Sequence, residues 1–422
     1  MFDSERALIA RMAALEAVKS AAAAEQAELA VQFEKERCER EIAAGIPASR
    51  RGRGIAGEIA LARKDSPNRG GRHLGFAKAL VFEMPHTLAA LKANALSEWR
   101  ATLIVRESAC LSVEDRGELD RRMCADTTEL EGLGDKRIEA RAREIAYELD
   151  PQAFVDRAVK KEAERTVSVR PAPDNMAYVT ALVPMPKGVG IFAALKRQAD
   201  VACDGRGRGQ VMADTLYERV TGRPAEAPVP IAVDLVITDE TLLAGDTTPA
   251  RVPGYGPIPA AIACQLTGDA ILDERSKATL RRLYRHPASG ALVAMESRAR
   301  LFPKGLAQLI AFRDDTCRTP YCDAPIRHTD HAQPHAADGP TSELNGLGAC
   351  EACNYTKESP GWRVVTARQR DGTHTADVTT PTGNRYRSKA PPLPGRRTRP
   401  SRVETVFADD LAWADAVMDN AA

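Results

Sequence analysis

The sequence has no long apolar run. Among its 422 residues there is no uninterrupted apolar stretch of the roughly 20 residues that a membrane-spanning helix needs. The N-terminal segment carries Asp3, Glu5, Arg6 and Arg11 where a secretory leader would be continuously apolar. We therefore expect no membrane partner and a cytoplasmic location.

The sequence also lacks a large net charge, an internal repeat and a phosphate-binding loop. Its formal net charge is +1, which by itself indicates no polyionic partner. No similarity at the periods of solenoid proteins is evident. The glycine-rich residues 205–209 have neither a preceding strand nor the Lys-Ser/Thr ending of a phosphate loop, so they do not indicate nucleotide binding.

Four of the nine cysteines form two close pairs, Cys317 with Cys322 and Cys350 with Cys353, separated by 27 residues. Such pairs can place four thiolates around one structural Zn²⁺, whose binding would stabilise a segment with few large apolar residues. Four unrelated thiols and two disulfides are the alternatives. The remaining cysteines are scattered, and we expect them to be reduced. They are Cys38, Cys110, Cys124, Cys203 and Cys264.

The segment between the cysteine pairs is typical of a β-hairpin followed by a helix. Residues 326–331 can form a strand, whereas Pro334 and the triplet 338–340 favour a loop. Residues 345–350 can form the returning strand, and residues 351–358 a helix.

Polar residues of this hairpin and helix have chemistry suited to a second metal. Asp330 and His331 end the first strand, while Asn354 and Lys357 share one helical face. The oxygens of Asp330 and Asn354 are hard donors suited to Mg²⁺ or Mn²⁺. A neutral His331 beside such an ion could deprotonate water for attack on phosphorus. Lys357 could neutralise a phosphate or only solvate the helix.

Residues 317–357 resemble an HNH endonuclease of the ββα-metal type, in the subgroup with zinc-binding cysteine pairs around the active site. The resemblance implies that His331 is the general base, that Asn345 braces the loop bearing it, and that Asp330 is a metal ligand. Asn354 occupies the position of the last residue of the His-Asn-His motif that gives the family its name. Many members of the family carry Asn there and retain metal binding, which implies a preference for Mg²⁺ or Mn²⁺.

A second resemblance covers about residues 10–395. The segments 208–216, 359–362 and 381–388 are similar to bacterial proteins in which domain of unknown function 222 precedes an HNH domain, often named the 13E12 repeat family. This resemblance implies no mechanism for the N-terminal part, because the role of that domain is not established.

Helical periodicity and turn residues predict an α+β fold. We expect a mainly helical domain with short β-hairpins over residues 1–299, a small zinc-stapled ββα-metal (HNH) domain over 300–365, and a basic, Pro-rich extension over 366–422. The arginine- and glycine-rich residues 50–75 are expected to form a hinge or loop. Helices are expected over 5–44, 76–95, 97–110, 113–126, 135–165 and 208–221, and β-structure over 166–183, 228–238 and 280–296.

Positive charge gathers after the proposed HNH helix. Residues 357–402 contain eleven Lys and Arg against three Asp and Glu, which is typical of a nucleic-acid contact. Lys357 and Arg363 are the candidates nearest the proposed site. A solvated tail is the alternative, because prolines interrupt any helix there.

These observations favour a metal-dependent HNH endonuclease that hydrolyses phosphodiester bonds in DNA, with Mg²⁺ or Mn²⁺ for catalysis and Zn²⁺ for structure. The alternative is a non-catalytic, zinc-stapled nucleic-acid-binding or scaffold protein. The set of Asp330, His331, Asn345 and Asn354 favours the enzyme, because none of them is needed to fold a four-cysteine zinc site. The helical domain could serve binding, self-association or regulation.

Overall fold

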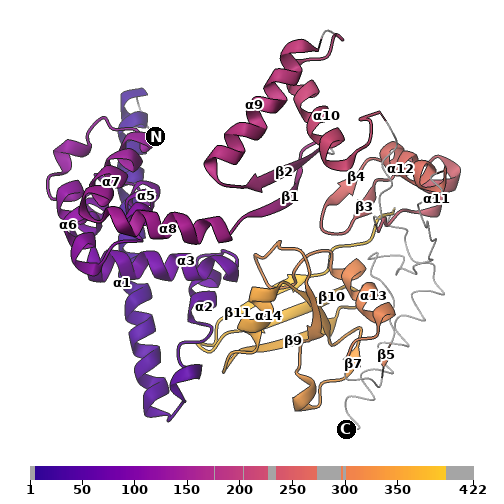
Figure 1. The fold of residues 1–422 in the computed structure, drawn as a ribbon. Helices are drawn as coiled ribbons and strands as arrows, with labels where there is room; N and C mark the ends of the chain where they lie inside the picture. The colour runs from indigo at the N-terminus through magenta and orange to yellow at the C-terminus, as the bar shows by residue number, and fades with distance from the viewer. Residues whose placement is uncertain are drawn as a thin grey trace.

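The computed structural model describes residues 5–174, 176–202, 204–226, 234–272, 296–297 and 301–395. The fold is mixed α+β, with a helical N-terminal region and short antiparallel sheets, as expected. Figure 1 shows a helical bundle at the N-terminal end, an arm of one hairpin and two helices, and a module of small sheets toward the C-terminal end. No helix of the described ranges is long and apolar enough to cross a membrane.

The N-terminal bundle is built around one apolar core. Leu80, Met84, Leu91, Ile104 and Leu119 have no exposed surface within it. The expected long first helix is confirmed, since α1 runs over 39 residues. The bundle comprises α1 (Glu5–Ala43), α2 (Ile55–Ala62), α3 (Pro67–Lys78), α4 (Pro85–Lys92), α5 (Glu98–Ser108), α6 (Val113–Cys124), α7 (Asp135–Leu149) and α8 (Pro151–Ala163).

The expectation of a hinge or loop over residues 50–75 is wrong, because most of this segment forms α2 and α3. Glycine serves close packing here: a Cβ on Gly70 would lie 1.8 Å from the Ala56 carbonyl oxygen. Only glycine therefore lets α3 approach the backbone of α2 this closely. Pro67 is the first residue of α3, where the N–H that proline lacks would have no helical partner.

The single helix expected over residues 135–165 is two helices, α7 and α8. Pro151 cannot continue α7, because it lacks a backbone N–H and its ring would clash with the preceding turn. Instead it starts α8, and the Asp150 carboxylate caps this helix by accepting a hydrogen bond from the Ala153 N–H at 2.9 Å.

The arm that follows the bundle contains the expected β-structure over 166–183 and the expected helix over 208–221. Its two strands pair in register from Thr166↔Leu182 to Ala172↔Met176 and are exposed along nearly their whole length. The expected hairpin over 280–296 lies outside the described residues except for Glu296, and only residues 234–238 of the expected strand over 228–238 are described. The arm consists of β1 (Thr166–Ala172), β2 (Met176–Leu182), α9 (Met185–Val201) and α10 (Arg208–Thr221). The elements that follow it are α11 (Asp239–Ala244), β3 (Ala250–Val252), β4 (Gly256–Ile258) and α12 (Ala260–Leu272).

The C-terminal module contains the hairpin and helix expected between the cysteine pairs. Asp330 pairs with Leu347, and His331 with Gly346, in an antiparallel ladder that α14 follows. The elements are β5 (Glu296–Ser297), α13 (Lys304–Asp314), β6 (His328–His331), β7 (Thr341–Ser342), β8 (Gly346–Ala349), α14 (Glu351–Lys357), β9 (Arg363–Arg368), β10 (His374–Thr379) and β11 (Arg385–Lys389).

The structure differs from the expected extension after residue 365. Strands β9, β10 and β11 form an antiparallel sheet in the order β11-β10-β9. Its inner face contributes Val364, Ala376 and Val378 to an apolar cluster with Leu347 of β8. Alternation of apolar and polar residues is typical of half-buried strands. This pattern was not recognised in the sequence because the segment is rich in Arg and Thr.

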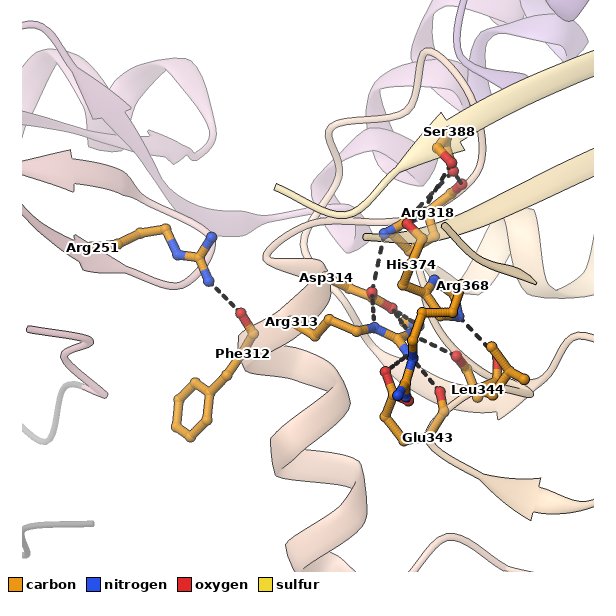
Figure 2. A network of polar contacts seen from close by, with 12 residues as sticks. Arg251, Phe312, Arg313, Asp314, Arg318, Glu343, Leu344, Arg368, His374 and Ser388 are labelled. Carbon is orange, nitrogen blue, oxygen red and sulfur yellow. Dashed lines mark hydrogen bonds and ion pairs between the residues drawn. The ribbon is translucent and has the colours of Figure 1, made fainter. Parts of the chain in front are cut away.

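Buried charges join α13 to the rest of the module (Figure 2). The Asp314 carboxylate accepts hydrogen bonds from Arg313 at 2.7 Å, Arg318 at 3.2 Å and the Gly348 N–H at 2.7 Å. Burial opposes ionisation of Asp314, but the Arg313 guanidinium outweighs it, and the pKa of Asp314 lies below its usual range. Arg313 also contacts Glu343 at 2.9 Å, and Arg318 reaches the Ser388 carbonyl oxygen at 3.2 Å. The network therefore connects α13, the hairpin and β11.

The bundle packs directly on the module through α2 and α3. A Cβ on Gly54 would lie 2.4 Å from the Trp362 indole nitrogen, and one on Gly57 2.7 Å from the Thr356 methyl group. The buried Glu58 carboxylate accepts hydrogen bonds from Arg37 at 2.9 Å and from the Thr382 N–H at 3.0 Å. Two segments far apart in sequence thus share one interface.

We predict that Gly70→Ala destabilises the bundle by about 1–3 kcal/mol, because the new methyl group overlaps the backbone of α2. Gly71→Ala is the matched control, since its Cβ would meet nothing within 4 Å. The control should stabilise α3 by about 0.4–1 kcal/mol, because the unfolded chain loses freedom. Thermal and urea unfolding of both variants measure the difference. Equal stability of the two variants would contradict the close crossing.

Candidate functional site

The four paired cysteines come together in one cluster. The sulfur atoms of Cys317, Cys322, Cys350 and Cys353 all lie within 4.8 Å of one another, and all four residues are buried, free thiols. Cys322 Sγ and Cys350 Sγ are 3.9 Å apart. A tetrahedral zinc with Zn–S bonds of about 2.3 Å requires S···S separations of about 3.8 Å. The cluster therefore fits a zinc ion, and the alternatives of disulfides and of unrelated thiols do not describe it.

The protonation of the cluster points to the same conclusion. Hydrogen bonding to Cys322 raises the pKa of Cys317 to about 12, and hydrogen bonding to Cys317 and Cys322 raises the pKa of Cys353. The converse contacts, from Cys317 and then Cys353, lower the pKa of Cys322 to about 2. Four thiolates this close repel one another, so a divalent cation is what lets all of them ionise together.

A side chain from the bundle reaches this cluster. The Ser66 hydroxyl lies close enough to Cys322 to help lower the pKa of that thiol, and α3, which begins next to Ser66, packs on α14. Sequence reasoning missed this contact, because the residues are more than 250 positions apart and serine before a helix is ordinarily only a cap.

Asp330 and His331 lie together at the end of β6. Asp330 Oδ1 accepts a hydrogen bond from the His331 N–H at 2.9 Å and lies 3.6 Å from His331 Nδ1. His331 Nε2 lies 2.9 Å from the Thr341 hydroxyl, and its ring packs against Phe302 at 4.6 Å between centroids. Burial lowers the pKa of His331 and so favours its neutral imidazole, although the neighbouring Asp330 opposes this shift.

Asn345 closes the loop between the two strands of the hairpin. Its Oδ1 accepts a hydrogen bond from the Gln333 N–H at 2.9 Å, and its Nδ2 donates to the carbonyl oxygens of Gln333 at 3.0 Å and Pro340 at 2.8 Å. The side chain therefore uses its donors and its acceptor to fix the chain directly after His331.

Asn354 and Lys357 lie on α14, which packs against β6. Asn354 Oδ1 is buried and has no hydrogen-bond partner among the described residues. Lys357 Nζ contacts Asp330 Oδ2 at 3.0 Å and the His331 carbonyl oxygen at 2.9 Å. Burial opposes ionisation of Asp330, yet the Lys357 ammonium outweighs it and holds the pKa of Asp330 below its usual range.

Arg363 is the first residue of β9, and its side chain is exposed. The site thus brings together Asp330, His331, Asn345 and Lys357, with Asn354 one helical turn before Lys357. Sequence reasoning missed Phe302 and Thr341, which surround the imidazole. Neither residue carries a chemical signal of its own, because each acts only through its contact with His331.

Comparison with known protein families gives one match. The family model described as domain of unknown function (DUF222) covers residues 9–314. The chain belongs to the DUF222 family. No curated protein matches the chain, and no solved structure matches it. The expected DUF222 resemblance is therefore confirmed for this range. The cysteine cluster and β6, β8 and α14 lie beyond residue 314 and outside the DUF222 match.

We predict that DUF222 protein purified without chelator contains about one zinc per chain, and that replacing Cys350 and Cys353 with Ser releases it. The module should then become sensitive to protease, because metal binding contributes to its folding. Cys110→Ser is the control, since this thiol lies in the bundle. Elemental analysis measures the metal. Zinc-free wild-type protein, or a double variant that keeps its zinc, would contradict the assignment.

Proposed function

We propose that this DUF222 protein is a metal-dependent endonuclease of the HNH type that hydrolyses phosphodiester bonds in DNA. One observation carries the proposal: one hairpin and the helix packed on it carry an imidazole whose burial favours the neutral form, a carboxylate, and a buried amide oxygen that has no partner among the described residues. These groups belong to His331, Asp330 and Asn354. A four-cysteine zinc site needs none of them to fold, so their presence beside it supports a chemical role.

His331 is the general base of the proposed reaction. Its lowered pKa keeps the ring unprotonated, which is the form that accepts a proton from water. Asp330, 3.6 Å from Nδ1, and Thr341, 2.9 Å from Nε2, fix the plane of the ring. Asn345 holds the loop that follows, so the imidazole keeps its position while the substrate binds.

Asp330 and Asn354 are the residues that would hold a catalytic Mg²⁺ or Mn²⁺. The Asn354 oxygen is a hard donor without a hydrogen-bond partner in the described part of the chain, which fits such an ion. When bound, the ion would supply positive charge to a phosphodiester and its leaving oxygen. Lys357 already places one positive charge on Asp330, and it would share this carboxylate with the ion.

The zinc cluster has a structural part in this proposal. Its ligands come from the loop before β6 and from the start of α14, the same elements that carry Asp330 and Asn354. A closed shell of four thiolates leaves no position for water, so this zinc positions the site and does not activate a nucleophile.

A second function, nucleic-acid binding without cleavage, is favoured by two contacts. Lys357 neutralises Asp330, and the His331 side chain is 8% exposed behind Phe302. In this alternative the hairpin and α14 would be a structural support for a nucleic-acid-binding surface elsewhere on the protein. The two functions make different predictions: the nuclease cleaves DNA and needs His331 to do so, whereas the binding protein does not cleave DNA.

We predict that His331→Ala abolishes nicking of supercoiled plasmid in Mg²⁺ or Mn²⁺, with a loss of at least about 100-fold, because a general base contributes about that factor or more. Zinc content and DNA affinity should stay close to wild type. His328→Ala is the matched control, since His328 lies on the same strand and is exposed. If the wild type never nicks DNA but binds it, or if His331→Ala nicks at the normal rate, the proposed mechanism fails.

We also predict that Asn354→Ala raises the Mg²⁺ concentration needed for half-maximal cleavage, whereas Glu351→Gln on the exposed side of the same helix leaves it unchanged. The reason is that Asn354 supplies one of the few protein ligands. Titration of cleavage rate against Mg²⁺ and Mn²⁺ measures the effect. Identical titrations for the two variants would remove Asn354 from the ion.

A further inference from the structure

The interface between the bundle and the module places basic residues of the two parts side by side. Gly54 of the bundle packs on Trp362 of the module, so their sequence neighbours Arg53 and Arg363 flank the same contact. Both arginines are exposed. The location of α2 beside the end of the β9–β11 sheet is visible in Figure 1.

The register of the sheet brings a further arginine to this junction. Thr379 pairs with Arg363 on one side and with Arg385 on the other, so the two arginine side chains point to the same face. That face is the outer one, because Val364 and Val378 in the next row are buried. The turn after Thr379 carries Thr382, which contacts Glu58 of α2. Arg363 and Arg385 therefore lie at the end of the sheet that meets the bundle.

Three acidic residues near this junction already have partners. Glu58 is buried with Arg37 and Thr382, and Asp65 accepts hydrogen bonds from the Ser66 N–H and from Arg69 and also contacts His73. Asp377, on the outer face of the sheet, is paired with Arg387.

Four exposed arginines on the α1–α2 connection and at this end of the sheet, in contrast, form no ion pair with any residue that the structure describes. They are Arg50, Arg53, Arg363 and Arg385, and all four are exposed. Asp377, which is already paired with Arg387, is the acidic group that Arg385 influences electrostatically. The four arginines therefore concentrate positive charge here, although the whole chain is nearly neutral.

We propose that these four arginines, which we call the junction arginines, form one surface that binds the phosphate backbone of duplex DNA. Exposed, unpaired guanidinium groups on a rigid interface suit phosphate oxygens, which they can contact with two parallel hydrogen bonds. The surface contacts no bases in this proposal, so it contributes affinity and position without sequence preference. The surface gives the α1–α2 connection of the DUF222 domain a direct role in holding DNA. The choice of DNA as the ligand rests on the proposed nuclease function.

The test uses full-length protein carrying His331→Ala, so that DNA survives. We expect Arg50→Gln/Arg53→Gln to weaken binding to unrelated duplexes alike and to lower the slope of log K against log salt by about 2, since each lost phosphate contact removes about 0.9. Arg363→Gln/Arg385→Gln should have the same effect. Lys136→Gln/Arg137→Gln is the matched control. These two adjacent basic side chains are exposed at the start of α7 and form no ion pair in the described part of the chain.

The outcomes separate this inference from the proposed function. Slopes equal to that of the parent for both junction variants, with folding confirmed by thermal unfolding, overturn the junction surface even if the wild type cleaves DNA. Reduced slopes in both junction variants with a normal slope in the control support it. Reduced slopes together with no cleavage by the wild type support the junction surface and overturn the nuclease. A parent that binds no duplex overturns both.

Discussion

The Asp314 carboxylate is the point on which the C-terminal module depends. It is fully buried, and its stability as an anion requires Arg313, Arg318 and the Gly348 N–H to be in place together. Losing one partner of such a buried pair costs about 3–5 kcal/mol, because the remaining charge is left without compensation. The network thereby couples the end of α13, the segment next to Cys317 and the strand β8, which are the supports of the zinc cluster and of the hairpin beside it.

The sequence could predict those parts of the site whose partners lie near one another in the chain. The cysteine pairs, the hairpin and α14 fall within about 40 residues, so spacing and local propensity were sufficient. The contact of Lys357 with Asp330 was not predicted. A lysine at this position of α14 could equally extend into solvent or form an ion pair, and the sequence does not distinguish the two. The docking of Gly54 on Trp362 and of Ser66 on Cys322 depends on packing between distant segments, for which no local pattern exists.

The glycines of residues 50–75 led to the wrong prediction of a hinge. In residues 50–75 it suggested a flexible connection, but Gly54, Gly57 and Gly70 occur where another chain segment approaches closer than a Cβ would allow. Glycine lacks that atom, and the same property serves both flexibility and tight contact. Only the position of the neighbouring segment distinguishes the two uses. The arginines between these glycines, Arg63 and Arg69, are correspondingly held by ion pairs with Glu98 and Asp65 and do not lie on a loose hinge.

The DUF222 match ends at Asp314, and this residue lies inside the module and not at its border. The region that defines the family is therefore not a folding unit. A polypeptide that stopped at residue 314 would leave a buried carboxylate without Arg318 and the Gly348 N–H. For dissecting the protein into autonomous pieces, the natural division lies before α13, and even then α2 and α3 would lose the surface on which they pack.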